Sequence, residues 1–205
     1  MKLTVFGATG GIGRQLITQG LAAGHEITAV ARRDPGDLGC EVVVAELGDH
    51  DAIAGAVAGR DAVLSALGPR GTGPSTVQAD GARAEVAAML ATGVRRIVSV
   101  DAAGRVADAG DSLLMRAVAK PLVQWVLRHG FADLAEAERV LRGSGLDWTL
   151  VAPPRLTDGG HRPYRTVVDR NVRSGRTLSR ADVAHAMLRV AGDPATIHRR
   201  VNVAY

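Results

Sequence analysis

Three glycines near the N-terminus have the spacing of a turn that binds phosphate groups. Gly7, Gly10 and Gly13 follow a short apolar stretch at 2–6 and precede a stretch with helical periodicity. Glycine lets the chain turn tightly and brings bare backbone N–H groups against a pyrophosphate, and the start of the following helix adds partial positive charge. The Gly-x-x-Gly-x-x-Gly spacing differs from the Gly-x-Gly-x-x-Gly of many dehydrogenases. Its strand, turn and helix context nevertheless predicts a dinucleotide site.

Two arginines at the end of the next apolar stretch indicate which dinucleotide fits. The stretch at 26–31 is followed directly by Arg32 and Arg33. At this place a site for NAD usually carries an acid that binds the ribose hydroxyls, whereas a site for NADP carries arginine for the 2′-phosphate. The sequence therefore favours NADP(H) as the cofactor. The alternative is that both arginines are ordinary solvated charges of a loop.

The acid best placed to supply a proton to a substrate is Asp101. It ends an apolar stretch at 95–101, where partial burial would keep some of its carboxyl group protonated near neutrality. Tyr164 is a second candidate for a catalytic role, because it lies with Arg155 in a loop that would cover the substrate. His129 lies between the fifth and sixth strands. A surface or capping role is the alternative for each residue, and for His129 it is favoured.

The elements that must position these residues alternate along the chain. Strand-like runs are predicted at 2–6, 26–31, 41–45, 61–67, 95–101 and 147–152, with a short late strand near 200–204. Helices are predicted between them at 11–23, 50–58, 75–92, 113–142 (broken) and 180–191. Ser179-Arg-Ala-Asp182 has the pattern of a capping box at the last helix. The alternation predicts an α/β fold of the Rossmann type, a doubly wound parallel sheet with helices on both faces.

In such a sheet, ligands bind over the carboxyl ends of the strands. The loops at about 68–75 and 153–165 should therefore meet at one crevice, which would hold the nicotinamide and the substrate. Each loop contains an arginine, Arg70 and Arg155 respectively, and both are candidate substrate ligands.

Length and composition restrict the remaining possibilities. The 205 residues are 46% hydrophobic, which suits a single domain over 1–205. No apolar run is long enough for a membrane span and no leader is recognisable, so a cytoplasmic protein is expected. Cys40 is the only cysteine, and the histidines lack the spacing of metal ligands, so no metal is expected.

The charge distribution and the missing motifs exclude several functional classes. The net charge is +4, but the basic residues are scattered among 21 acids and only six residues are aromatic, which does not favour nucleic-acid binding. There is no Gly-x-Ser-x-Gly elbow and no Gly-Lys-Ser/Thr phosphate loop, so hydrolase and nucleoside-triphosphatase functions have no supporting residues. The expected ligand is a small molecule, and the expected state is a monomer or homodimer.

Several motifs in order along the chain resemble the atypical short-chain dehydrogenase/reductases. The likeness is greatest to the NAD(P)H-binding, NmrA-like branch that includes biliverdin-IXβ and flavin reductases. It rests on the runs 7–13, 57–63, 67–70, 140–146 with the following Pro153-Pro154, and 179–189. The resemblance covers almost the whole chain and implies the fold and the cofactor, but it leaves the substrate open.

The resemblance also implies which residues contact the cofactor. For the pyrophosphate these are Gly7, Thr9, Gly10, Gly11 and Ile12. Arg32 and Arg33 would bind the 2′-phosphate, and Glu46 and Leu47 the adenine. Leu67, Gly68 and Pro69 would border the ribose on the nicotinamide side, and Pro153 and Pro154 the nicotinamide ring. Leu67 as a core residue and the two prolines as a strand terminator are the alternatives.

The chain departs from the family at its catalytic positions. Ordinary short-chain dehydrogenases use a Tyr-x-x-x-Lys pair for proton transfer, and this chain has none. Ala102 stands where the flavin-reductase-like members carry a serine. The leading hypothesis is therefore an NADPH-dependent reductase of a small, planar conjugated acceptor such as a flavin or quinone. The alternatives are an NADP(H)-binding regulator without turnover and a non-redox cyclase or dehydratase.

Overall fold

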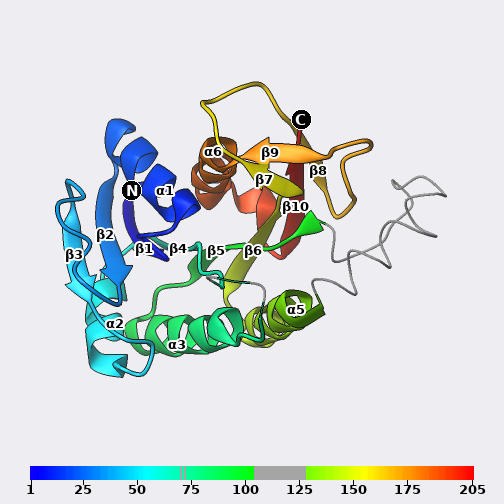
Figure 1. The fold of residues 1–205 in the computed structure, drawn as a ribbon. Coiled ribbons are helices and arrows are strands. Elements are labelled where there is room, and N and C mark those ends of the chain that lie inside the picture. The colour runs from blue at the N-terminus through cyan, green and yellow to red at the C-terminus, as the bar shows by residue number, and fades with distance from the viewer. Residues whose placement is uncertain (70, 72, 104–127) are drawn as a thin grey trace.

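The computed structural model describes residues 1–69, 71, 73–103 and 128–205, and these residues form an eight-stranded sheet flanked by helices (Figure 1). The strand order across the sheet is β3-β2-β1-β4-β5-β6-β10-β8. The strands are β1 (Lys2–Phe6), β2 (Glu26–Ala31), β3 (Glu41–Val44), β4 (Ala62–Ser65), β5 (Arg96–Val100), β6 (Asp147–Ala152), β8 (Arg165–Val168) and β10 (Arg199–Ala204). This order is that of a doubly wound α/β fold, which confirms the predicted class.

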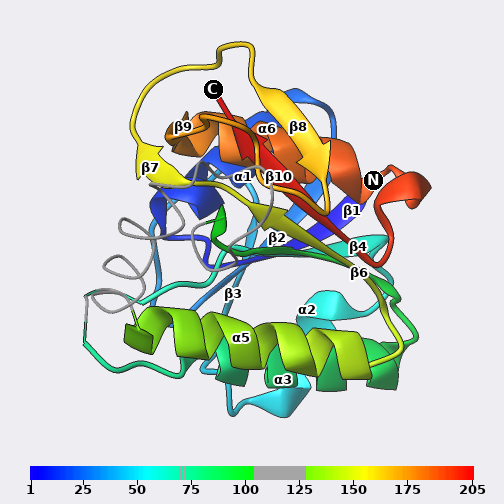
Figure 2. The same cartoon turned by 90° about the vertical axis from the view of Figure 1, so that its right-hand side faces the viewer.

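Two layers of helices cover the sheet, one on each face (Figure 2). One layer contains α1 (Gly11–Ala22) and α6 (Arg180–Ala191), and the other contains α2 (His50–Val57), α3 (Val77–Thr92) and α5 (Arg128–Gly143). Each layer encloses its own cluster of buried apolar side chains. The first apolar cluster lies between the sheet and α1 with α6, and the second lies between the sheet and α2, α3 and α5. Central strands covered on both sides need apolar residues at nearly every position, which explains the continuous apolar runs in the sequence.

The sequence does not predict three short strands near the C-terminus. β7 (Arg155–Thr157) and β9 (Thr177–Ser179) form a separate parallel pair, and β8 is an edge strand that runs antiparallel to β10. The sheet is therefore parallel as expected, except at this edge strand. No helix lies between β6 and β8, so the chain returns from β6 without the crossover that a parallel connection needs. Residues 113–127 of the predicted fourth helix lie outside the described residues.

The sheet reverses its order of connection between β1 and β4. From β1 the chain proceeds outward through β2 and β3, then returns to place β4 on the other side of β1. In doubly wound folds the loops on the two sides of such a point diverge, and ligands bind between them at the carboxyl ends of the strands. Gly7 follows β1 and Leu67 follows β4, so the glycine turn lies at the place where this fold binds ligands.

Candidate functional site

The glycine turn after β1 has room for backbone but not for side chains. Gly7 has a φ of +75°, and a Cβ added there would lie 2.5 Å from the carbonyl oxygen of Ala66. A Cβ at Gly13 would lie 2.1 Å from the carbonyl oxygen of Gly7, which also accepts a hydrogen bond of 2.9 Å from Gly10 N. Close approach of the β1 turn, the β4 end and the first turn of α1 therefore requires glycine at both positions.

The first turn of α1 is open to an anion. Its N-cap, Gly10, supplies no side-chain hydrogen bond, and the turn contains no acidic residue. Thr9, Gly10 and Gly11 are exposed, whereas the Ile12 side chain is buried in the core, so Ile12 can offer only its backbone. The first N–H groups of a helix have no partner within the helix, and here they lie just after the carboxyl end of β1, together with the positive end of the helix dipole.

The residues expected at the adenosine end lie after β2 and β3. Arg32 and Arg33 are exposed, and neither makes an ion pair or hydrogen bond with the described residues. The loop that follows them is held by Asp34, whose carboxylate accepts a hydrogen bond from Gly36 N. Glu46 is exposed and Leu47 half-buried after β3. Both arginines are therefore free to pair with a phosphate.

The residues expected at the nicotinamide end divide into exposed and packed groups. Gly68 and Pro69 are exposed, whereas Leu67 contacts the second apolar cluster, and a Cβ at Gly81 of α3 would lie only 2.2 Å from Leu67 Cδ1. Pro153 is buried, and its carbonyl oxygen accepts a hydrogen bond from Ala103 N. The packing of Leu67 thus supports its alternative role in the core. The candidate Arg70 lies outside the described residues.

Asp101 is buried, as expected, but it has a partner that the sequence does not reveal. Its carboxylate lies 2.5 Å from Nη2 of Arg200 on β10, and the side chains are only 2% and 11% exposed. Arg200 also donates a hydrogen bond to the carbonyl oxygen of Ala102. The carboxylate is engaged by a guanidinium from another strand, so this geometry supports the structural role of Asp101 over that of a proton donor.

Tyr164 lies against α6. Its hydroxyl group is 2.8 Å from Nδ1 of His185 and its ring packs at the edge of the first apolar cluster. Burial raises the pKa of Tyr164, and Asp182 adds to this, while Arg189 acts in the opposite direction. A phenol with a raised pKa is a weaker proton donor, which does not favour the expected catalytic role. Arg155, the other residue expected in this loop, is exposed at the start of β7.

A buried carboxylate, Asp182, organises the loop beyond β7. It accepts hydrogen bonds from the Tyr205 hydroxyl (2.5 Å), the Ser179 hydroxyl (2.9 Å) and the backbone N–H of Arg162 (3.2 Å), and lies 2.6 Å from His161 Nδ1. Burial raises the pKa of Asp182, but these hydrogen bonds outweigh burial and the pKa is lowered. Ser179 caps α6 through Asp182 N, which confirms the predicted cap.

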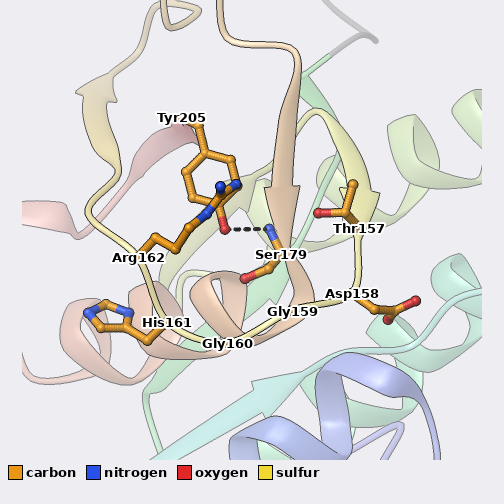
Figure 3. A pocket seen from close by; sticks show the side chains of 8 residues that line it. All are labelled: Thr157, Asp158, Gly159, Gly160, His161, Arg162, Ser179 and Tyr205. Carbon is orange, nitrogen blue, oxygen red and sulfur yellow. Dashed lines mark hydrogen bonds between the residues drawn. The ribbon is translucent and has the colours of Figure 1, made fainter.

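A cavity of about 350 Å³ lies beside this network (Figure 3). The guanidinium of Arg162 stacks on the ring of Tyr205 at 3.8 Å, and the hydroxyl of Tyr205 accepts a hydrogen bond from Ser179 N. The lining residues are Thr157, Asp158, Gly159, Gly160, His161, Arg162, Ser179 and Tyr205. Most of them belong to the loop at 153–165 that is expected to cover a substrate. The capping motif at 179–182 is the only local sequence signal near this network.

A family of proteins described as NAD(P)H-binding matches residues 7–194 of the chain. The match includes the glycine turn, the arginines after β2 and all of α6. The chain belongs to this NAD(P)H-binding family. The expected family and type of cofactor are thereby confirmed, whereas membership does not distinguish NADP from NAD.

Solved structures of similar proteins share the fold over almost their whole length. A candidate exported protein from Burkholderia pseudomallei is 29% identical, with a TM-score of 0.82 and complete coverage of both chains. A short-chain dehydrogenase/reductase from Veillonella parvula in complex with NADP is 18% identical, with a TM-score of 0.78 over 100% of this chain and 94% of the other. A candidate NADH-flavin reductase from Streptococcus pneumoniae is 21% identical, with a TM-score of 0.81 over 100% and 99%. These similarities confirm the Rossmann-type fold of this family member.

Curated relatives match either a part of the chain or nearly all of it at low identity. An uncharacterised protein of Mycobacterium tuberculosis is 33% identical over 100 residues, which are 48% of this chain and 12% of that protein. The chain therefore matches a small part of a much longer relative. Isoflavone reductase of Medicago sativa is 23% identical over 98% of this chain and 69% of its own length. Among the described residues, no helix has both the length and the apolar character needed to cross a membrane. The expected cytoplasmic location stays a prediction.

One buried acid of this family member, Glu85, lies on α3. Glu85 is 1% exposed, hydrogen-bonds to Ser65 at the end of β4, and its Oε1 has no hydrogen-bond partner among the described residues. Burial raises its pKa to about 7, and the hydrogen bond to Ser65 opposes this only in part. The sequence gives no sign of such a residue, because Glu85 resembles any glutamate of a surface helix.

Replacing Glu85 with glutamine is expected to remove a pH dependence of stability. The folded-state pKa of Glu85 is raised above its ordinary value, so the unfolded chain loses its proton first as the pH rises. The free energy of unfolding of the wild type should therefore fall by about 3 kcal/mol between about pH 4 and pH 8, relative to Glu85→Gln. Urea unfolding of both proteins across this range measures the difference. Glu46→Gln at an exposed site is the matched control, and parallel profiles for wild type and Glu85→Gln would contradict the prediction.

Proposed function

We propose that this protein is an NADPH-dependent reductase of a small, planar conjugated acceptor. The observation that carries the proposal is the open first turn of α1 beside the glycine turn, at the switch point of the sheet. In a family that binds NAD(P)H, this turn suits the pyrophosphate of the cofactor. The similarity to a candidate NADH-flavin reductase and to isoflavone reductase supports reduction as the reaction.

Different residues would bind the different parts of the cofactor and the substrate. Backbone N–H groups of the turn at 9–12 would hold the pyrophosphate, and Arg32 with Arg33 the 2′-phosphate. Gly68, Pro69 and Pro154 would border the nicotinamide side, and Arg155 is a candidate substrate ligand. When bound, the reduced cofactor supplies a hydride, so the chain needs only to orient the acceptor and exclude competing reactions.

We propose water as the source of the proton. Asp101 is ion-paired with Arg200, and the hydroxyl of Tyr164 lies 2.8 Å from Nδ1 of His185. Neither arrangement presents a strong acid to the crevice, and the chain has no Tyr-x-x-x-Lys pair. An acceptor such as a flavin can be reduced without a nearby acidic side chain, because its reduction requires no strong acid at a carbonyl oxygen.

Oxidation of NADPH in the presence of flavins, quinones and tetrapyrroles tests the proposed reaction. We expect turnover with at least one of these acceptor classes, followed as the loss of absorbance of the reduced nicotinamide. Tight binding of NADPH without turnover of any acceptor would contradict a reductase. Such a result would favour the second candidate, an NADP(H)-binding regulator, because the two expected proton donors are engaged elsewhere. Equal affinity for oxidised and reduced cofactor, together with a co-purifying partner, would support the regulator.

Replacing Arg32 with alanine is expected to weaken NADPH binding by about 1.5–3 kcal/mol, the range for hydrogen bonds to charged groups. The affinity for NADH should change little, since NADH lacks the 2′-phosphate that Arg32 would contact. Fluorescence titration with both cofactors measures the two affinities. Arg95→Ala, which removes an exposed arginine just before β5, at the amino-terminal end of that strand, is the control. Equal losses for NADPH and NADH would exclude a contact with the 2′-phosphate.

A further inference from the structure

A side chain from α6 lies across the start of α1. Arg180 is the first residue of α6, and its Cδ and Nε lie 2.5 Å and 3.0 Å from the position that a Cβ of Gly11 would take. Gly11 begins the helix whose open first turn suits the pyrophosphate. Arg180 therefore brings a positive charge to this turn from the far end of the sequence.

The guanidinium of Arg180 forms an ion pair with Asp158. Arg180 Nη1 and Asp158 Oδ1 are 2.6 Å apart, and the side chains are 34% and 90% exposed. In Figure 3 the carboxylate of Asp158 points away from Tyr205 and Arg162, so it reaches out of the cavity that its residue lines. An ion pair this exposed is screened by water and is weak, worth at most about a five-fold change in an equilibrium.

A diphosphate at the first turn of α1 would compete with Asp158 for the same guanidinium. It carries more negative charge than one carboxylate, and arginine binds phosphate oxygens through two parallel hydrogen bonds. We propose that Arg180 exchanges Asp158 for the diphosphate of NADP(H), and that cofactor binding thereby releases the segment at 158–160 from α6.

The released segment forms one edge of the cavity. Gly159, with a φ of +143°, and Gly160 follow Asp158 and allow the backbone to change conformation. Beyond them, His161 and the N–H of Arg162 stay attached to Asp182. The exchange thus changes the conformation of 158–160, while His161 and Arg162 keep their positions in the cavity wall. A second ligand would then enter the cavity after the cofactor has bound. This inference rests on the cofactor site of the proposed function but not on turnover.

Two single substitutions should shift NADPH affinity in opposite directions. Arg180→Ala removes a ligand of the diphosphate and should raise the Kd about 10- to 50-fold. Asp158→Asn removes the competing carboxylate and should lower the Kd about two- to five-fold. The double variant should bind as weakly as Arg180→Ala alone, because Asp158 acts only through Arg180. Titration of NADPH fluorescence measures all four proteins.

The opposite directions of the two changes in the Kd for NADPH distinguish this exchange from an ion pair that only stabilises the fold. If the pair only stabilised the fold, both substitutions would weaken binding or leave it unchanged, and either result would overturn the proposal. Arg199 and Asp169, 2.9 Å apart at β10 and the end of β8, form the matched control pair. Arg199→Ala and Asp169→Asn should leave the Kd as in the wild type. Failure of the wild type to bind NADPH would overturn the proposed function itself, a result distinct from unchanged variants.

Amide hydrogen exchange across 158–162 tests the release directly. Saturating NADPH should speed exchange at 158–160 in the wild type and should have little effect in Asp158→Asn, where the segment is already free. Slower exchange in the wild type on adding NADPH would overturn the release.

Discussion

Replacing Arg200 with alanine is expected to lower the free energy of unfolding by about 3–5 kcal/mol, the range for removing one partner of a buried ion pair. The substitution leaves the 2% exposed carboxylate of Asp101 without the guanidinium 2.5 Å away, and removes the hydrogen bond to the carbonyl oxygen of Ala102. Urea unfolding of both proteins at neutral pH measures the difference. A loss below about 1 kcal/mol would show that Arg200 is not the main partner of Asp101.

Asp101→Asn separates stability from catalysis at the same site. Asparagine keeps the shape of aspartate but cannot act as an acid, so turnover with a flavin should be retained if the proton comes from water. A fall of about 100-fold or more, with NADPH affinity preserved, would restore Asp101 as the proton donor. In a double-mutant cycle with Arg200→Ala, the coupling between the two residues should exceed about 1 kcal/mol.

Replacing Gly7 with alanine is expected to cost about 2–5 kcal/mol of stability and to weaken cofactor binding. The φ of +75° is unfavourable for a residue with a Cβ, and that Cβ would lie 2.5 Å from the carbonyl oxygen of Ala66. Because backbone is the obstacle, relief requires movement of β4 or of the turn, and either change would displace the N–H groups that face the phosphate. Thermal unfolding and NADPH titration measure the two effects.

Gly48→Ala is the matched control for this substitution. Gly48 is exposed, does not have a positive φ, and has no heavy atom within 4 Å of the position that its Cβ would take. The change should alter stability by less than about 1 kcal/mol. If Gly7→Ala and Gly48→Ala behave alike, the close approach of β1 and β4 does not depend on glycine at position 7.

Local sequence patterns predict the main strands, the helices and the position of the phosphate turn. The predicted strand at 2–6 matches β1, and the predicted helix at 180–191 matches α6 with its Ser179 cap. Such features are set by residues close together in the chain, because apolar periodicity, caps and glycine turns act over a few residues. The family resemblance also followed from local motifs in order.

Contacts between groups that are distant in the sequence depend on how the chain folds. Elements that are distant in the sequence bring Asp101 to Arg200. They also bring Arg180 to the start of α1 at Gly11. The short antiparallel strand β8 likewise depends on its partner β10. No local pattern encodes these contacts, since a lone charged residue has the same appearance in a sequence whether it is solvated or paired. Its charge state and its role depend on burial and on its partner, and both exist only once the chain has folded.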